Sequence, residues 1–168
     1  MKKLFTILPL MALVILSVSC KKDTPRISNT IADSSELAFV VKPIKGSNTA
    51  SKELKLTDFS KVTSAKVTPT RATVSNVSFI SVTGIKNKLE LSNLTIQVKD
   101  NKTLSHSLGK VAKDQTFKSP QEIAFLQKIV NEMLKTKSTK LDLVVTASEK
   151  LDSDIKITLK LNVNFQKK

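Results

Sequence analysis

The last part of the chain carries the feature that most constrains the fold, an unbroken alternation of apolar and polar residues. The apolar positions recur at every second residue: Ile155, Ile157, Leu159, Leu161, Val163 and Phe165. The polar positions between and beside them are Asp154, Lys156, Thr158, Lys160, Asn162 and Asn164. Successive side chains of a strand point to opposite faces, so this pattern predicts a long strand with one face in a core and the other in water.

Other segments show the same period over shorter lengths. Four further segments carry apolar residues at every second position: 36–42, where Leu37, Phe39 and Val41 share one face, 52–56, 65–67 and 141–147. The segment 141–147 has one exception to the alternation, Val144. Each of these segments predicts a strand with one buried face.

Two segments depart from a simple period. Residues 72–85 are rich in β-branched side chains and apolar on both faces, which predicts a central strand covered on both sides or a strand with a bulge. Residues 89–98 change parity, because the apolar positions are first odd and then even. A change of parity would turn half of these side chains into water, so we expect a bulge or strand break near Ser92 and Asn93. The residues 99–102 that follow predict a turn.

One helix is predicted, over about residues 119–136. Ser119 and Glu122 have the spacing of a capping box, and Pro120 suits the first helical position. A single apolar stripe follows at helical spacing, formed by Ile123, Leu126, Ile129, Val130, Met133 and Leu134.

Many strands with polar turns and one inserted helix favour a mainly β fold, an antiparallel β-sandwich, with an immunoglobulin-like arrangement as one form of it. The helix would be a crossover at an edge or end of the sandwich. The alternative is a curved antiparallel sheet that wraps the helix and leaves an apolar groove.

The start of the chain has the three parts of a secretory signal. Lys2 and Lys3 precede an apolar core over residues 4–16, and the small residues Ser17 and Ser19 follow it. A membrane-spanning helix needs about 20 apolar residues. Charge arrives here at Lys21, so an uncleaved anchor is the less favoured interpretation.

The sequence LSVSC at residues 16–20 resembles the lipobox of bacterial lipoproteins, in which a small residue precedes an obligatory cysteine. Ser19 and Cys20 match that pattern, whereas Ser17 stands where the family usually has an aliphatic residue. The continuation SCKKD is similar to a form found in lipoproteins of the Bacteroidota. The resemblance implies that Cys20 is acylated and becomes the new N-terminus, in a protein held in the cell envelope, at the outer membrane.

The chemistry of a lone cysteine agrees with this interpretation. Cys20 has no partner for a disulfide within the chain, and acylation would remove an exposed thiol. The alternative is a free or intermolecularly paired thiol. We therefore divide the chain into a signal peptide over 1–19, a lipidated N-terminus with a flexible tether over 20–35, and one β-sandwich domain over 36–168.

Few residues have the types and spacings that catalysis or metal binding requires. His106 is the only histidine, and no cysteine lies in the predicted domain to help it bind a metal. Asp142 falls on the polar face of a strand, while Asp152 and Asp154 flank a turn and lack the rest of a calcium loop. We expect no catalytic residue, no metal and no cofactor.

The basic charge is the remaining feature. The net charge is +14, yet arginine occurs only twice and the chain has no Trp or Tyr. Nucleic acid is therefore an unfavoured partner, because base and phosphate recognition favours arginine and stacking aromatics. A candidate basic patch comprises Lys86, Lys88, Lys140, Lys156 and Lys160. It would suit acidic glycans, lipopolysaccharide phosphates or an acidic protein, while the plainer interpretation is a solvated face that discourages edge-to-edge pairing.

The leading hypothesis for function is a membrane-anchored envelope lipoprotein that acts as a non-enzymatic interaction or structural module. The first alternative is a carrier of a lipid or other apolar ligand, in a groove beside the helix near Phe125, Leu126 and Met133. The second alternative is a hydrolase whose carboxylates the sequence does not identify.

Overall fold

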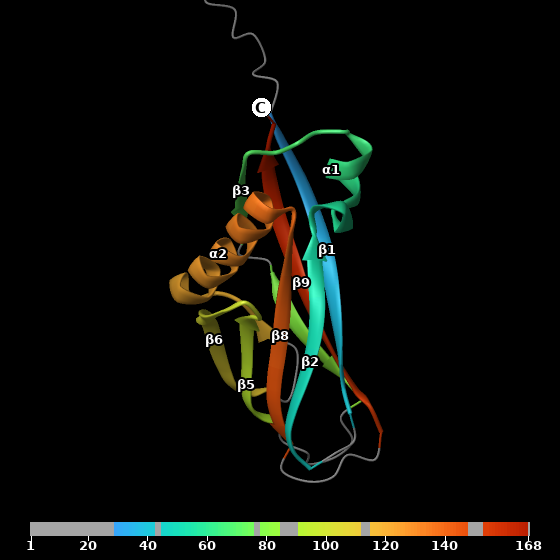
Figure 1. The fold of residues 1–168 in the computed structure, drawn as a ribbon, viewed down its shortest axis with the longest axis vertical. Coiled ribbons are helices and arrows are strands. Elements are labelled where there is room, and N and C mark those ends of the chain that lie inside the picture. The colour runs from blue at the N-terminus through green and yellow to red at the C-terminus, as the bar shows by residue number, and fades with distance from the viewer. Residues whose placement is uncertain are drawn as a thin grey trace, which may run out of the picture.

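The computed structural model describes residues 29–42, 45–75, 78–84, 91–111, 115–147 and 153–167. These residues form two antiparallel sheets and one long helix (Figure 1). In chain order the elements are β1 (Thr30–Val41), β2 (Gly46–Lys55), the 3-10 turn η1 (Leu56–Asp58), α1 (Ser60–Ser64), β3 (Arg71–Val74), β4 (Phe79–Thr83), β5 (Leu91–Val98), β6 (Asn101–Val111), β7 (Gln115–Thr116), α2 (Pro120–Thr136), β8 (Ser138–Ala147) and β9 (Ile155–Gln166).

The strand order defines the two sheets. Sheet A has the order β1-β9-β4-β7, with β3 also paired to β9, and sheet B has the order β2-β8-β5-β6. The predicted antiparallel β-sandwich with one main helix is confirmed. Its strand order is not that of an immunoglobulin domain, because here the first strand pairs with the last along the whole length of both.

Strand β9 forms the middle of sheet A, and its predicted faces are confirmed. Its six apolar side chains from Ile155 to Phe165 are all at most 1% exposed. Its alternate residues are half-buried or exposed. On one side β9 pairs with β1, and on the other it pairs with β3 and β4. The alternation in the sequence therefore correctly identified the strand to which β1, β3 and β4 all pair.

The two predicted irregularities are present. The chain covers five positions from Val74 to Phe79 while its partner β9 covers only three, between Val163 and Lys160, so β3 and β4 are two pieces of one bulged strand beside β9. Strand β5 shifts its register against both neighbours between Leu91 and Thr95. Asn93 has φ 54° at this point, a left-handed conformation that asparagine tolerates better than most residues. The bulge in β5 lets Leu91 and the even-numbered Leu94, Ile96 and Val98 all stay in the core.

Helix α2 begins as predicted. The Ser119 hydroxyl accepts a hydrogen bond from the Glu122 amide at 3.2 Å. The Glu122 carboxylate accepts in return from the amides of Ser119 and Lys118 at 2.8 and 2.9 Å. Burial alone would raise the pKa of Glu122, but these hydrogen bonds outweigh it and hold that pKa below its usual value. The capping box is confirmed.

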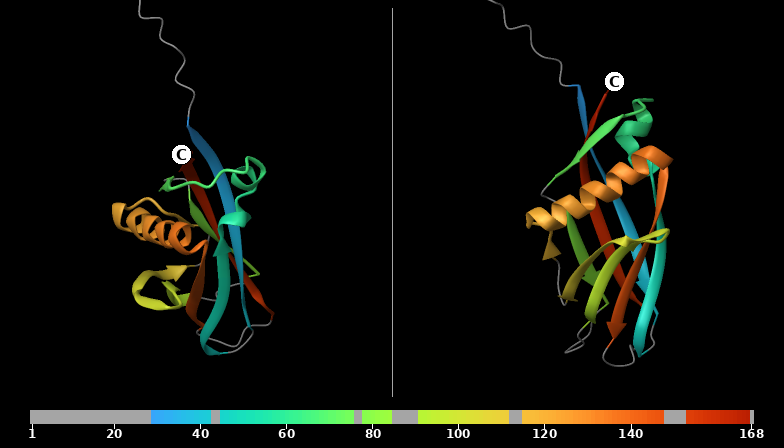
Figure 2. Two further views of the ribbon diagram at one scale, coloured as in Figure 1. Left: turned by 45° about the horizontal axis from the view of Figure 1, so that its top comes forward. Right: turned by 60° about the vertical axis from the view of Figure 1, so that its left-hand side comes forward.

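Helix α2 packs between the two sheets. It contacts β3 of sheet A and β6 and β8 of sheet B, and Figure 2 shows it crossing the molecule beside the β5–β6 hairpin. The Gln127 side chain accepts from the Val74 amide at 2.9 Å and donates to the Ala72 carbonyl at 2.8 Å. The helix therefore holds the short strand β3 by its backbone as well as by apolar contact.

Two local predictions are wrong. Residues 65–67 are not a strand, because the chain forms η1 and α1 before them and continues without regular structure until β3. Strand β1 begins at Thr30, inside the segment predicted as tether, so the domain starts earlier than residue 36. The inward positions of its first half are Asp33 and Ser35, and polar residues at core positions hid the strand period.

Candidate functional site

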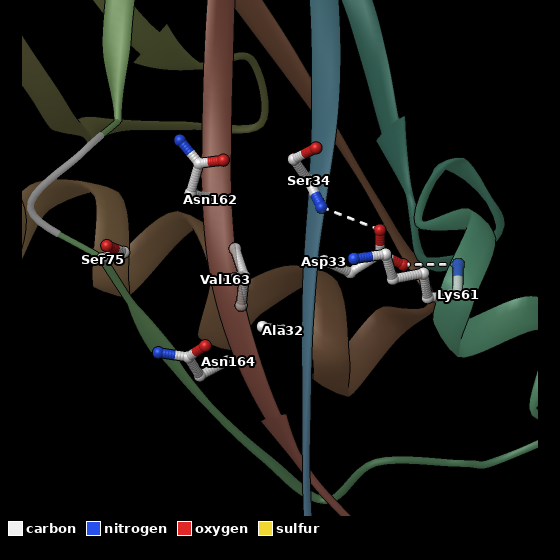
Figure 3. Close-up of a pocket in the computed structure, with 8 residues that line it drawn as sticks. All are labelled: Ala32, Asp33, Ser34, Lys61, Ser75, Asn162, Val163 and Asn164. Carbon is white, nitrogen blue, oxygen red and sulfur yellow. Dashed lines mark hydrogen bonds between the residues drawn. The ribbon is translucent and has the colours of Figure 1, made fainter.

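One of the hollows on the described surface lies on sheet A near the start of β1. It has a volume of about 330 Å³ and lies across β1 and β9, between α1 and the bulge that follows β3 (Figure 3). Its lining residues are Ala32, Asp33, Ser34, Lys61, Ser75, Asn162, Val163 and Asn164. We call it the β1–β9 hollow.

Asp33 anchors α1 to β1 at one side of this hollow. The side chain is buried, and one carboxylate oxygen accepts from the amides of Lys61 and Val62 at 2.7 and 3.1 Å. The other oxygen accepts from the Ser34 amide at 2.8 Å. The first amides of a helix lack partners within the helix, and a negative charge there is favourable. Asp33 therefore supplies the cap that α1 lacks in its own sequence.

Apolar packing fixes α1 from beneath. The residue before the helix is Phe59, which makes no side-chain capping bond and is fully buried. Its ring meets Phe165 of β9 edge-to-face, with centroids 4.9 Å apart and an interplanar angle of 73°. Val62, one turn on, is 1% exposed. These contacts set α1 beside the paired ends of β1 and β9, where the exposed Lys61 can reach the hollow.

Ser75, which directly follows β3, lies at the opposite wall of the hollow. The Ser75 amide donates to the Asn162 carbonyl at 2.8 Å, and the Asn162 amide donates to the Ser78 hydroxyl at 3.1 Å. A serine hydroxyl therefore replaces the backbone partner that the irregular strand cannot offer. Both backbone groups of Asn162, the amide and the carbonyl, therefore have hydrogen-bond partners, which holds this wall of the hollow in place.

The hollow can hydrogen-bond an oxygen-rich group. Figure 3 shows Lys61 extending its side chain from α1 back toward β1, while Ser34, Ser75, Asn162 and Asn164 line the remaining surface. These groups offer one cation together with hydroxyl and amide donors and acceptors. Among the lining residues there is no histidine or cysteine, and Asp33 is already engaged with three amides. The arrangement can hydrogen-bond a polar ligand.

The structure does not bring the predicted lysine patch together. Lys156 and Lys160 lie on the outward side of β9 in sheet A, whereas Lys140 lies on β8 in sheet B. The Lys160 ammonium pairs with the Glu36 carboxylate at 3.1 Å, and the Lys160 side chain is only 31% exposed. Lys86 and Lys88 lie outside the described residues. Alternation identified the outward positions correctly, but it does not tell which sheet a strand joins.

Cys20 also lies outside the described residues, so its acylation stays a prediction. The early start of β1 nevertheless changes the predicted tether. Only residues 21–29 now separate Cys20 from Thr30. The link between the proposed lipid and the domain is therefore nine residues long instead of the 15 residues, 21–35, that the sequence pattern suggested.

The other polar residues considered in the sequence, where the structure describes them, contact neighbouring side chains of the fold. His106 lies on β6 and stacks on Phe125 of α2, with centroids 5.3 Å apart and an interplanar angle of 29°. Asp142 is buried on β8 and accepts from the Ser51 hydroxyl at 2.6 Å. Asp154 is exposed and pairs with Lys42 at 3.3 Å, while Asp152 lies outside the described residues. Within the described segments, no three histidine, cysteine or acidic side chains gather in a way that could hold a metal ion.

The space beside α2 is polar. Two hollows of about 280 and 340 Å³ flank its C-terminal half, and they share Asn101 and Glu132. The first also contains Glu53, whose pKa is lowered by a hydrogen bond from Ser138 and by nearby Lys55. Phe125, Leu126 and Met133 are all buried in the core. The residues that line the two described hollows beside the helix are therefore mostly polar, and the apolar stripe of α2 packs in the core.

The residues of the β1–β9 hollow were not singled out from the sequence. The position of Asp33 in the apolar period could have identified it. Asp33 has the same parity as Leu37, Phe39 and Val41, so it falls on the core face if the strand is extended toward the N-terminus. A carboxylate on a core face needs hydrogen-bond partners, which points to an element packed on that end of the strand. The pairing of Lys61 with this site has no signal in the local sequence.

Over the part of the chain that the structure describes, neither helix has the length and apolar character to cross a membrane. Comparison of the chain with protein-family models, curated proteins and solved structures found no match.

Proposed function

We propose that the protein is a lipid-anchored, non-enzymatic interaction module of a bacterial envelope. The observation that carries this proposal is the lone Cys20, which follows an apolar segment and a small residue and precedes the charged pair Lys21 and Lys22. Acylation at that position would give the domain a firm hold on a membrane, because more than one chain is needed for stable anchoring.

The position of the chain ends supports a defined orientation for such a module. The Lys167 amide donates to the Asn29 carbonyl at 2.7 Å, so the chain enters the domain where it also leaves it (Figure 1). The nine residues 21–29 reach at most about 30 Å when extended. As a coil they span roughly 17 Å. The end of the sandwich that carries Asn29 would therefore stay near the bilayer, and the other end would project away.

The interaction role rests on the surfaces that the domain presents. The β1–β9 hollow offers hydrogen-bonding groups without a nucleophile and base in contact, and the apolar side chains of α2 are used for packing. Binding of a polar partner accounts for these features better than catalysis or transport of an apolar ligand.

The anchor is tested by replacing its attachment atom. We expect Cys20→Ser to move the protein from the membrane fraction to the soluble fraction of the cell of origin. Mass spectrometry of the wild-type protein should show a chain that begins at Cys20 and carries acyl groups.

Ser17→Leu is the matched control, because it brings the sequence closer to the lipobox pattern and should preserve or improve processing. Membrane retention of Cys20→Ser, or a mature wild-type chain that still begins at Met1, would overturn the proposal.

A further inference from the structure

One end of the sandwich gathers the chain termini and a set of exposed cations. We define the α1 end as the start of β1, the end of β9, α1, the segment 65–70 and the start of β3. Figures 1 and 2 show these segments together at the top of the molecule, beside the C-terminus. Thr30 and Arg71 both pair with Gln166, which confirms that the three strand ends meet.

The cations of the α1 end are Lys61, Lys66, Arg71 and Lys167, and all four are exposed. None of them forms an ion pair with an acidic side chain of the described segments, whereas Lys42, Lys55, Lys135 and Lys160 do. Their charges are therefore left for an external partner.

The acidic residues nearby do not cancel this charge. Asp33 is buried and engaged with the backbone of α1. Asp58 is exposed, but its carboxylate accepts from the Lys55 amide at 2.8 Å. Among the described residues, the α1 end thus carries four exposed cations and one exposed carboxylate at the place where the chain enters the domain.

We propose that the α1 end docks on the anionic lipid headgroups of the membrane to which the chain is anchored. The inference rests on the proposed anchor, since a short tether from Cys20 brings this end to the surface. Each lysine or arginine near an anionic surface adds attraction that fades within a Debye length. A lipid anchor and a basic patch together hold a protein more firmly than either does alone.

The β1–β9 hollow gives the docked headgroups a place to bind. Lys61 of α1 lines the hollow together with Ser34 of β1 and Asn164 of β9. A headgroup phosphate accepts hydrogen bonds from an ammonium, a hydroxyl or an amide N–H, and lysine binds phosphate as a point charge. The docked surface would then combine diffuse attraction with a local binding site for phosphate oxygens.

The experiment uses the acylated protein reconstituted on vesicles of phosphatidylcholine, with or without phosphatidylglycerol, and with a nitroxide quencher on the headgroup of a trace lipid. A thiol-reactive fluorophore is placed on α1 with Ser64→Cys, or at the far end with Ser153→Cys; both residues are exposed. We expect strong quenching at residue 64 on anionic vesicles, weaker quenching there on neutral vesicles or in high salt, and weak quenching at residue 153 throughout.

A triple variant tests the charges themselves. Lys61→Gln, Arg71→Gln and Lys167→Gln together should weaken docking roughly fivefold per charge removed at low salt. The matched control is Lys45→Gln, Lys110→Gln and Lys156→Gln, which removes equal charge from the opposite end and should leave quenching at residue 64 unchanged. Circular dichroism melts verify that both triple variants fold.

The outcomes separate the two proposals. Quenching at residue 64 that ignores lipid composition and salt in the wild-type protein would overturn the docking surface even if the triple variant failed to fold. Equal effects of the two triple variants would also overturn it. Failure of the wild-type protein to stay on neutral vesicles would instead overturn the anchor, and binding to anionic vesicles alone would retain the docking surface without it.

Discussion

The two α-helices begin in opposite ways. Helix α2 is capped by its own sequence, because Ser119 and Glu122 exchange hydrogen bonds across one turn. Helix α1 has Phe59 at the corresponding position and no side-chain cap there. Its first amides bond instead to Asp33, which lies 28 residues earlier on β1.

This difference separates a helix that can form early from one that depends on the finished fold. A local capping box and 17 helical residues favour α2 from its own segment. Five residues make α1 far too short to persist alone, since isolated helices shorter than about 12 residues are marginal in water. The geometry of the β1–β9 hollow, including the position of Lys61, therefore depends on long-range contacts.

The largest effect should come from removing the apolar anchor of α1. Phe59→Ala deletes a fully buried ring that packs on Phe165, and we expect a loss of about 3–5 kcal/mol in the free energy of unfolding, measured by urea denaturation. Ser60→Ala, at the next and exposed position, should change it by no more than about 0.5 kcal/mol. A loss below about 1 kcal/mol for Phe59→Ala would show that packing does not hold α1.

The second effect concerns the distant cap. Asp33→Ala leaves the buried Val62 amide and the Lys61 amide without their acceptor, and we expect a loss of about 1–3 kcal/mol together with faster amide exchange in α1. Ser119→Ala, the local counterpart in α2, should lose about 1 kcal/mol with its exchange change confined to the first turn of that helix. If Asp33→Ala left amide exchange in α1 unchanged, the cap assigned to Asp33 would be wrong.

The smallest effect is a pH dependence that belongs to the local cap. The pKa of Glu122 is below the usual 4.5, so its carboxylate stabilises the folded state above that value and loses this effect as the pH falls through the lowered pKa. Glu122→Gln keeps a capping acceptor but removes the charge. In thermal melts between pH 3 and pH 6, the advantage of the wild-type protein over this variant should shrink toward acid; a constant difference would contradict the charge effect.

The same distinction explains what the sequence could predict of the fold. Strand β9, helix α2 and both bulges follow from periods and caps within one segment. The first half of β1 and the whole of α1 do not, because Asp33 and Ser35 occupy core positions and are satisfied only by folding. A polar residue at a core position predicts a partner, but it does not say which segment supplies it.

The candidate site shows the same limit more sharply. Alternation put Lys156 and Lys160 on one outward face, yet it gave no information that Glu36 on β1 lies beside Lys160. Assignment of strands to sheets, which separates Lys140 from them, depends on contacts between segments far apart in the chain. The cations of the α1 end come from α1, the segment after it, β3 and the C-terminus, and no local pattern groups them.

The pairing of the first strand with the last also sets the order of events in folding. Thr30 pairs with Gln166, and β2 pairs with β8, two strands that lie between these residues in the sequence. Each of these two strand pairs therefore joins segments that are far apart in the chain. Sheet A cannot assemble on the ribosome before β9 has emerged, because β9 is the partner of β1, β3 and β4. Such distant contacts make folding slow. A chain cut before residue 155 would leave three strands without their common neighbour, so sheet A should form only after β9 has been synthesised.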